Sequence, residues 1–397
     1  MINTIGNKEE FKKFVEDIKN SSIYKEPLSF GICRVDRGQK NYETILQAVF
    51  PVVNYKENYG SGAIFLKALS EAGFEINKDL SEAVFDLNRE FIDNCINAFA
   101  PFLTEAKNDN HKNVQVIKYL DKVFDVEPNS FKIVFLFEDA PPKSVESVYL
   151  KLYALSLGKA PLRGVNLNGA FGILKNVAWS GNKPIELEWL RENELELKFS
   201  GKYPLIDSVD KFPRFLQHII PADNTRILDS SKVRFGAQLA SGTTVMPGAS
   251  YINFNAGTLG AAMVEGRISS SAVVGKGSDI GGGASILGVL SGTSGNPISI
   301  GENCLLGANS VTGIPLGDGS IVDAGIAVLE GTKFYMSSDE YKKIKEINPK
   351  WESEYKKIYK GKELAGLNGL HFRQDSTTGK MVVYRSNKEV KLNEELH

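Results

Sequence analysis

A hydrophobic residue returns at every sixth position through most of the region 227–334, and small residues fill much of the space between. A period of six fits neither an α-helix nor an ordinary β-strand. It is typical of a parallel β-helix, in which each hexapeptide forms one flat side and its recurring hydrophobic residue points inward. The predicted inward residues are Ile227, Val233, Leu239, Val245, Tyr251, Ile268, Val274, Ile280, Ile286, Ile300, Leu306, Leu316, Val322, Val328 and Phe334.

Glycine supports the same fold class. More than half of the chain's 37 glycines lie within the repeat, where tight corners require a positive φ angle. A left-handed β-helix uses three hexapeptides per coil and therefore forms a triangular prism. The flat faces of such a prism are moderately apolar, and trimer formation is the usual way to bury them. We therefore expect a homotrimer with three grooves between subunits.

The segments on either side of the repeat predict ordinary elements. Helical patterns occupy 8–19, 62–75, 80–106, 144–158 and 207–219, and β-rich runs occupy 45–53 and 131–137. After the repeat, a charged helical stretch precedes the segment LHFRQDSTTGKMVVYR, which predicts a hairpin that turns at Thr378–Gly379 and covers the open end of the β-helix. The predicted domains are a mixed α/β domain at 1–225, a left-handed β-helix at 226–336, and a helix and hairpin at 337–397.

Composition narrows the class of protein. Hydrophobic residues make up 42% and charged residues 24% of the chain, as in an ordinary globular protein. The net charge of −1 gives no reason to expect a nucleic acid or a membrane as partner. Cys33, Cys95 and Cys304 are too few and too scattered for a disulfide framework. With neither a signal peptide nor a hydrophobic span in the sequence, we expect a cytoplasmic protein.

The six-residue rhythm fails at three places, and a regular scaffold is expected to carry its chemistry where its regularity breaks. Ile268 arrives one residue early, after the segment Met263–Arg267. The segment LGVLSGTSGNPIS, between Ile286 and Ile300, has two residues too many and predicts a projecting loop. The spacing from Leu306 to Leu316 is ten residues where twelve are expected.

The chemistry available at these breaks is limited, because the repeat contains no histidine. A histidine base and a zinc ion held by three histidines therefore lose support. A catalytic group within the repeat must then be a carboxylate, and most of the candidates lie at corners, where a solvated surface charge is the simpler explanation. Glu265 differs because it lies at a break, two residues before Arg267 and close to the polar run 253–255.

Glycines within the repeat provide candidate backbone hydrogen-bond donors for a catalytic site. The backbone N–H groups of Gly281 to Gly283 and of Gly288 can approach a bound thioester, and an N–H aimed at its carbonyl oxygen stabilises a tetrahedral intermediate by roughly 3 kcal/mol. The alternative is that these glycines only turn corners, and the sequence leaves both readings open. The segment GKGSD at 275–279 lacks the strand-to-helix context of a phosphate-binding loop.

Longer motifs resemble one family. NFNAGTLGAAMVEGRIS, VVGKGSDIGGGASILGVLSG, SIGENCLLGANS, VDAGIAVLEGTK, FRQDSTTGK and the closing LNEELH are similar to segments of the tetrahydrodipicolinate N-succinyltransferases in their longer form. The resemblance covers roughly residues 220–397, and the first 200 residues match only loosely. It implies transfer of a succinyl group from succinyl-CoA to the amino group of ring-opened tetrahydrodipicolinate, a step toward diaminopimelate and lysine, by a trimer with its sites between subunits. Succinyl-CoA is then a cosubstrate, and no tightly bound cofactor is implied.

The resemblance also implies roles for individual residues. Glu265, in MVEGRIS, becomes the catalytic carboxylate, either as a general acid/base or as a nucleophile that forms an acyl anhydride. Gly288 becomes the oxyanion donor. The implied coenzyme contacts are Arg267, Gly282, Ser285, Ala308, Asp323, Ala324, Gly331, Lys360, Arg373, Gln374, Asp375 and Ser376. Arg226, Lys232 and Arg234 are candidates, by position only, for the two carboxylates of the acceptor.

One departure from the family concerns metal. Relatives that bind a divalent cation on the trimer axis carry an acidic residue in each of two stretches, which here read SSKVRFGA and VMPGASY without a carboxylate. We therefore expect no axial metal.

Two alternatives to the succinyltransferase stay open at this stage. One is a β-helix acetyltransferase acting on a sugar nucleotide or a serine-like hydroxyl, which usually needs a stronger base. The other is an assembly protein in which the solenoid is only a scaffold.

Overall fold

The computed structural model describes residues 1–289, 295–387 and 390–392 and divides them into two compact units. Unit 1 consists of Met1–Ala154 and Val165–Pro213, and unit 2 consists of Leu155–Gly164 and Arg214–His397. The intervening segment 155–164 therefore belongs with unit 2, although its neighbours in sequence on both sides belong to unit 1. The three-domain division at 225/226 and 336/337 stays a prediction.

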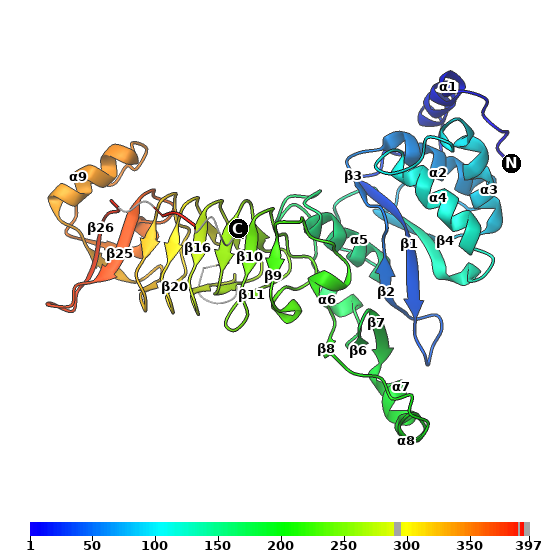
Figure 1. Cartoon of the computed structure of the whole chain (residues 1–397). Coiled ribbons are helices and arrows are strands. Elements are labelled where there is room, and N and C mark those ends of the chain that lie inside the picture. Colours follow the sequence, from blue (N-terminus) through cyan, green and yellow to red (C-terminus); the bar gives the residue numbers. More distant parts are fainter. Residues whose placement is uncertain (290–294, 388–389, 393–397) are drawn as a thin grey trace. The chain divides into compact units, whose positions relative to one another are not determined.

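Unit 1 is built on an antiparallel sheet with the strand order β2-β1-β5-β4, and β3 also pairs with β1 (Figure 1). Alternate residues of β1 and β5, such as Phe30, Ile133 and Phe135, join the hydrophobic core formed with α1 to α4. The strands are β1 (Ser29–Arg37), β2 (Ile45–Val49), β3 (Asn54–Tyr55), β4 (Glu82–Asp86) and β5 (Phe131–Leu136). The helices are α1 (Lys8–Lys19), α2 (Tyr59–Glu71), α3 (Arg89–Ala98), α4 (Lys112–Val123) and α5 (Val145–Ser156).

A smaller antiparallel sheet, β7-β6-β8, completes unit 1. Its strands are β6 (Val177–Ser180), β7 (Lys183–Glu186) and β8 (Ser208–Asp210), and the helices beside them in sequence are α6 (Ala170–Ile173), α7 (Leu187–Glu192) and α8 (Glu194–Phe199).

Two of the predicted helices are wrong. The range 80–106 begins with β4, which pairs with β5, and α3 starts only after Asn88, whose side chain accepts the N–H of Phe91 and so caps that helix. The range 207–219 begins with β8, and only Phe215–Gln217 forms a short 3₁₀ turn.

Unit 2 contains a β-helix with three parallel faces, as predicted (Figure 1). The first face consists of β9 (Arg226–Ile227), β10 (Thr243–Val245), β13 (Ala262–Val264), β16 (Ser278–Ile280), β19 (Leu305–Leu306) and β21 (Ile321–Val322). The second face consists of β11 (Tyr251–Ile252), β14 (Arg267–Ile268), β17 (Ser285–Ile286), β20 (Val311–Thr312) and β22 (Ala327–Val328). The third face consists of β12 (Gly257–Thr258), β15 (Val273–Val274) and β18 (Ser299–Ile300).

Burial confirms most of the predicted inward positions. Twelve of them are nearly or fully buried: Val233, Val245, Ile268, Val274, Ile280, Ile286, Ile300, Leu306, Leu316, Val322, Val328 and Phe334. Tyr251 is a wrong prediction, because Ile252 pairs in register with Ile268 and is fully buried, whereas Tyr251 is only partly buried. The rhythm therefore already gains one residue between Val245 and Ile252.

The corrected register gives the length of the corner at the first predicted break. Val264, the next inward residue of the first face, pairs with Ile280, and Ile268 follows it on the second face after only Glu265, Gly266 and Arg267. The corner at Glu265 is therefore shorter by two residues than a regular hexapeptide allows. The predicted projecting loop after Ile286 includes residues 290–294, which lie outside the described residues, as do 393–397 of the closing LNEELH motif.

The C-terminal segment closes the end of the β-helix, as predicted. In the hairpin of β25 (Leu370–Gln374) and β26 (Met381–Arg385), β25 pairs with β21 in parallel and so extends the first face. β23 (Lys333–Tyr335) pairs with both β24 (Ile358–Lys360) and β26, and α9 (Ser338–Ile347) lies beside the hairpin (Figure 1). The turn falls where it was predicted, with Gly379 at a φ angle of +68°.

Candidate active site

One edge of the prism, between the first and second faces, carries several of the predicted site residues. Backbone hydrogen bonds link these residues from one coil to the next. The Gly283 N–H donates to the carbonyl oxygen of Glu265. In the following coils, the Asn309 N–H donates to the carbonyl oxygen of Gly282, and the Gly325 N–H donates to the carbonyl oxygen of Ala308. Ala324 continues the series in the next coil. We call this set the open edge; its members are Glu265, Gly282, Ala308 and Ala324. Ala308 and Ala324 are exposed, so most of the edge presents small groups to solvent.

Glu265 is held by the sheet, while its side chain lies over the next coil. Its N–H donates to the carbonyl oxygen of Ile280 at 2.8 Å, so its backbone keeps the ladder intact. Its carboxylate is turned toward Gly282, because a Cβ atom built on Gly282 would stand 3.4 Å from Glu265 Oε2. The absence of a side chain at position 282 therefore leaves one side of this carboxylate accessible.

The three consecutive glycines differ in what they do. A Cβ atom on Gly281 would stand 2.7 Å from the carbonyl oxygen of Leu306 in the next coil, so Gly281 is required for close packing. Gly283 has a φ angle of +72°, which favours glycine at a corner. Only Gly282 has neither constraint, and its nearest neighbour in space is the Glu265 carboxylate. The corner explanation therefore accounts for Gly281 and Gly283 but not for Gly282.

Arg267 and Ser285 lie side by side on the second face, next to the open edge. Their strands are in register, and the Arg267 guanidinium donates to Ser285 Oγ from Nε at 3.1 Å and from Nη2 at 2.7 Å. Arg267 is otherwise exposed. A guanidinium in this position can bind a carboxylate or a phosphate with two parallel hydrogen bonds.

A charged cluster terminates the open edge at the last coil. His371 Nε2 lies 2.7 Å from Asp323 Oδ1, and Arg373 Nε lies 3.4 Å from Asp323 Oδ2. The His371 ring also packs against Tyr384, with 4.6 Å between ring centroids. Asp323 and Arg373, both predicted from sequence, are thus brought together, whereas His371 was missed because no histidine lies in the repeat itself.

Gly288 does not lie on the open edge. It follows β17 at the opposite border of the second face, where a Cβ atom built on it would stand 3.2 Å from the Cβ of Ser269. Glu265 precedes β14, and β14 and β17 are parallel and in register. One chain therefore places Glu265 and Gly288 at opposite borders of the same face. Within the described part of the chain, the Gly288 N–H has no acceptor.

The remaining predicted contacts lie beyond the regular coils. Gly331 follows β22, and Lys360 pairs with Lys333 across β23 and β24. Gln374, Asp375 and Ser376 lie at the end of β25 and in the hairpin turn. The Asp375 carboxylate accepts hydrogen bonds from Thr377 and Thr378, which lower the pKa of that carboxyl to about 2. This carboxylate therefore already stabilises the turn.

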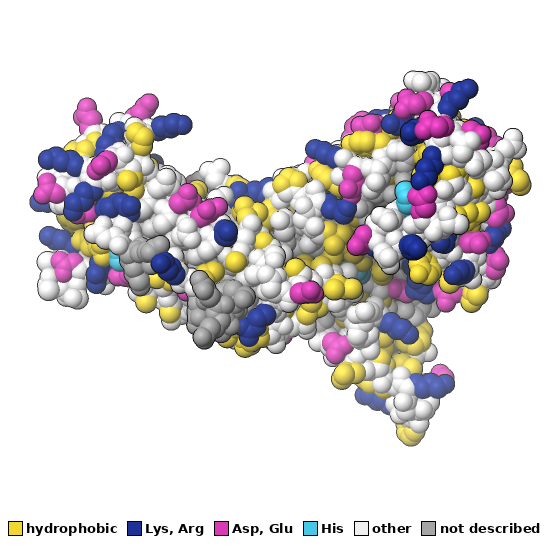
Figure 2. Space-filling model, turned by 45° about the horizontal axis from the view of Figure 1, so that its top comes forward, with side chains coloured by type: hydrophobic (Ala, Val, Ile, Leu, Met, Phe, Trp, Pro, Cys, Tyr) yellow, Lys and Arg dark blue, Asp and Glu magenta, His cyan; other side chains and the backbone are white. Residues whose placement is uncertain are grey.

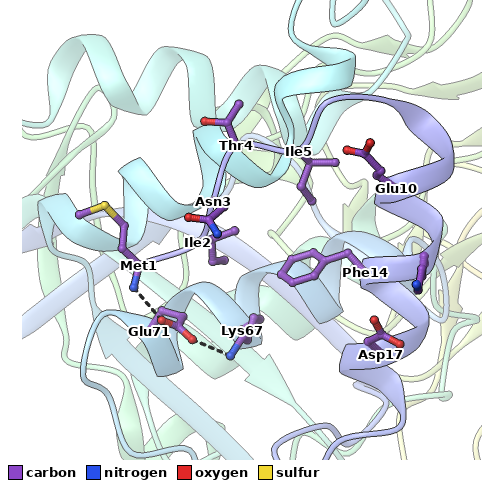
Figure 3. A pocket seen from close by; sticks show the side chains of 11 residues that line it. Met1, Ile2, Asn3, Thr4, Ile5, Glu10, Phe14, Asp17, Lys67 and Glu71 are labelled. Carbon is purple, nitrogen blue, oxygen red and sulfur yellow. Dashed lines mark hydrogen bonds and ion pairs between the residues drawn. The ribbon is translucent and has the colours of Figure 1, made fainter.

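A separate hollow of about 440 Å³ in unit 1 lies between the first residues of the chain, α1 and α2 (Figure 3). Its charged groups partly neutralise one another: Glu71 pairs with the Met1 amino group at 2.7 Å and with Lys67 at 2.6 Å. These two cations hold the pKa of Glu71 near 2. We assign no chemistry to this hollow.

Other classes of site find little support in the described residues. No group of three histidine, cysteine, aspartate or glutamate side chains in the described ranges is arranged to hold a metal ion. The three cysteines are buried thiols, and burial raises the pKa of each. Among the described helices, none is long and apolar enough to cross a membrane.

Comparison with family models extends the resemblance to the first 200 residues, where the motifs alone gave only a loose match. A model described as the N-terminal part of tetrahydrodipicolinate N-succinyltransferase matches residues 9–172. A model of the middle part of the same family matches 174–214, and a hexapeptide repeat of succinyltransferases matches 297–330.

Individual relatives agree along the whole length. A 2,3,4,5-tetrahydropyridine-2,6-dicarboxylate N-succinyltransferase from Nitratiruptor sp. is 75% identical over 99% of this chain and 100% of its own. The enzyme of the same name from Campylobacter jejuni is 62% identical, with 100% of both chains covered. A crystal structure from Campylobacter jejuni, described as a putative 2,3,4,5-tetrahydropyridine-2-carboxylate N-succinyltransferase, is 61% identical, covers 98% of this chain and 100% of its own, and superposes with a TM-score of 0.92.

Proposed function

The chain belongs to the tetrahydrodipicolinate N-succinyltransferase family, and we propose that it transfers the succinyl group of succinyl-CoA to the amino group of ring-opened tetrahydrodipicolinate. The amine nitrogen attacks the thioester carbonyl carbon, the carbon–sulfur bond breaks, and the proton lost by the amine balances the proton taken up by the coenzyme A thiolate. The products are N-succinyl-2-amino-6-oxopimelate and coenzyme A, on the route to diaminopimelate and lysine.

The observation that carries the assignment of the catalytic group is the position of the Glu265 carboxylate beside Gly282, at the shortened corner. This carboxylate is the general base of the proposal, which takes the proton from the attacking amine. A base positioned within hydrogen-bonding reach of its proton contributes about 10²- to 10⁴-fold to a rate. The open side above Gly282 is the place for the thioester carbonyl.

The open edge is the proposed track for the coenzyme. Successive coils are about 4.8 Å apart, so the small residues at 282, 308 and 324 line a shallow path that leads away from Glu265. The path ends beside Arg373, and Lys and Arg side chains gather at this end of unit 2 (Figure 2). Basic side chains are the usual partners of phosphate groups, so the anionic part of the coenzyme lies at this end in the proposal.

The position of the proposed oxyanion donor, Gly288, is the argument for a homotrimer. Gly288 is assigned to stabilise the tetrahedral intermediate through its N–H, a contribution of about 3 kcal/mol. Because Glu265 and Gly288 lie at opposite borders of the second face, one chain cannot present both to the same thioester. In the proposal, a neighbouring copy supplies the second group, so each site lies between two chains of a cytoplasmic trimer without an axial metal.

Two experiments test this proposal. The first measures coenzyme A release with tetrahydrodipicolinate and either succinyl-CoA or acetyl-CoA; a higher kcat/KM with acetyl-CoA contradicts the succinyl assignment. The second mixes Glu265→Gln chains with Gly288→Val chains after mild denaturation and reassembly. Hybrid oligomers then contain sites with both native residues, so activity returns although neither variant is active alone. Hybrid oligomers that stay inactive contradict a site built from two chains.

A further inference from the structure

The segment 155–164 lies along a different edge of the prism from the coenzyme track. This edge joins the second and third faces, and we call it the strapped edge; its members are Gly236, Asn255, Ser271 and Ile298 in successive coils. Near the start of the segment, Ser156 Oγ accepts the Gly236 N–H at 2.9 Å. Gly158 lies beside Gln238 in the same coil. The segment ends in unit 2 with Arg163 and Gly164.

Arg163 makes four hydrogen bonds to this edge. Its backbone N–H donates to Asn255 Oδ1 at 2.8 Å, and its Nε donates to the carbonyl oxygen of Ser271 at 2.7 Å. Its Nη2 donates to the carbonyl oxygen of Ile298 at 2.6 Å, and its Nη1 donates to Ser299 Oγ at 3.0 Å. One residue therefore ties together three successive coils, and it uses all three nitrogens of its guanidinium.

These contacts are made at a conformational cost. Arg163 has a φ angle of +66°, in the left-handed region that is unfavourable for a residue with a Cβ atom. Partial burial of its guanidinium also lowers the pKa of Arg163. A residue persists in such a conformation only where its surroundings determine it strongly, and such residues concentrate at functional sites. Lysine cannot replace it, since one ammonium group lacks the planar fork that reaches two carbonyl oxygens and a hydroxyl.

The strapped edge connects Arg163 to Gly288. The corner Ser269–Ser271 lies between them: Arg163 Nε holds the carbonyl oxygen of Ser271, while Gly288 packs on Ser269. Of the other partners of the guanidinium, Ile298 directly precedes β18 and Ser299 is its first residue, at the start of the third-face strand that follows Gly288 in the chain. Arg163 thus contacts both the corner on which Gly288 packs and the residues at the start of β18.

We propose that Arg163 is a positioning residue for acyl transfer, which acts by fixing the corner that presents the Gly288 N–H to the thioester carbonyl. This inference rests on the role assigned to Gly288 in the proposed function. Because the oxyanion develops only in the transition state, loss of the positioning reduces kcat more than it raises the KM for succinyl-CoA.

The test compares Arg163→Ala, Arg163→Lys and Arg163→Gly in the full-length protein. We expect kcat to fall about 10- to 100-fold in all three variants, with a much smaller change in the KM for succinyl-CoA. Arg163→Gly relieves the backbone strain, so it separates the loss of the guanidinium from a loss of stability. Arg89→Ala, which removes an arginine paired with Asp93 and Asp121 on the surface of unit 1, is the matched control and keeps its kcat.

A double-mutant cycle tests whether Arg163 affects kcat through Gly288. If Arg163 acts through Gly288, then Arg163→Ala lowers kcat far less in the Gly288→Ala background than in the unmodified enzyme. Addition of methylguanidinium should also restore part of the kcat of Arg163→Gly. Additive losses, or a defect confined to the melting temperature, overturn the proposal. An unmodified chain that transfers no succinyl group contradicts the proposed function itself, and so the two failures are distinguishable.

Discussion

The open edge and the strapped edge border the same face of the β-helix, yet they present opposite surfaces. Along the open edge, glycine and alanine place only small groups beside the Glu265 carboxylate. Along the strapped edge, the segment 155–164 covers successive corners and satisfies their carbonyl oxygens. These two edges of the repeat therefore differ, and in the proposed function the coenzyme needs one border free while the backbone of the other is held in place.

The largest expected effect comes from a change at the Glu265 end of the open edge. Replacing Glu265 with glutamine removes the proposed base and keeps the shape of the side chain, so kcat for coenzyme A release should fall about 10²- to 10⁴-fold. Initial rates with both substrates, together with calorimetric binding of succinyl-CoA, measure the chemical step and the binding separately. The binding should persist, because the coenzyme path along Gly282 and Ala308 is unchanged.

The matched control for this variant is Glu302→Gln. Glu302 occupies an exposed corner of the same β-helix, between the third and first faces, and carries the same functional group away from both compared edges. It should retain full activity. Equal losses in the two variants would show that a carboxylate at any corner affects kcat through the electrostatic potential of the whole protein. Glu265 would then have no specific role as the general base.

The second prediction concerns the interior beside the strapped edge. His218 stacks on the buried Phe235, with 4.5 Å between ring centroids, and burial lowers the pKa of the histidine to about 3. In the unfolded chain the same group titrates near 6.5. As the pH falls from about 6.5 toward 3, the unfolded chain binds a proton that the folded chain does not, so the free energy of unfolding decreases by up to about 1.4 kcal/mol per pH unit.

Urea unfolding at a series of pH values measures this dependence. His218→Phe keeps the aromatic contact and should reduce the slope below pH 6, whatever it does to stability at neutral pH. His111→Phe removes a partly exposed histidine from unit 1 and leaves the buried one in place, so its slope should stay that of the unmodified chain. An unchanged slope in His218→Phe would mean that other groups cause the acid sensitivity.

Much of the β-helix was predictable because burial imposes the hexapeptide period on the sequence. The error at Tyr251 shows the limit of that argument: Tyr251 and Ile252 are both hydrophobic neighbours, so periodicity alone does not choose between them. The choice depends on an extra residue in the preceding corner, between Val245 and Ile252. The shortened corner at Glu265 was identified, but its length became clear only from the pairing of Val264 with Ile280.

The strapped edge gave no signal in the sequence. Arg163 binds two backbone carbonyl oxygens, of Ser271 and Ile298, and every residue type provides such an oxygen. His371 was missed for a related reason, since its approach to Asp323 depends on how the C-terminal hairpin aligns with β21. Contacts made through the backbone, or through the packing of distant segments, leave no local pattern.

The smallest expected effect tests whether the open edge is used as a path. Ala308 is exposed between Gly282 and Ala324, so Ala308→Leu adds bulk where the coenzyme should lie without disturbing the core. The KM for succinyl-CoA should rise about tenfold, the scale of a misfit of a methylene group or more in a binding site, while kcat at saturation changes less. Glu302→Leu makes the corresponding change at an exposed corner off the path, and its KM should stay that of the unmodified enzyme. If both leucine variants keep the original KM, the coenzyme does not follow the open edge. The asymmetry between the two edges would then concern only the Glu265 carboxylate.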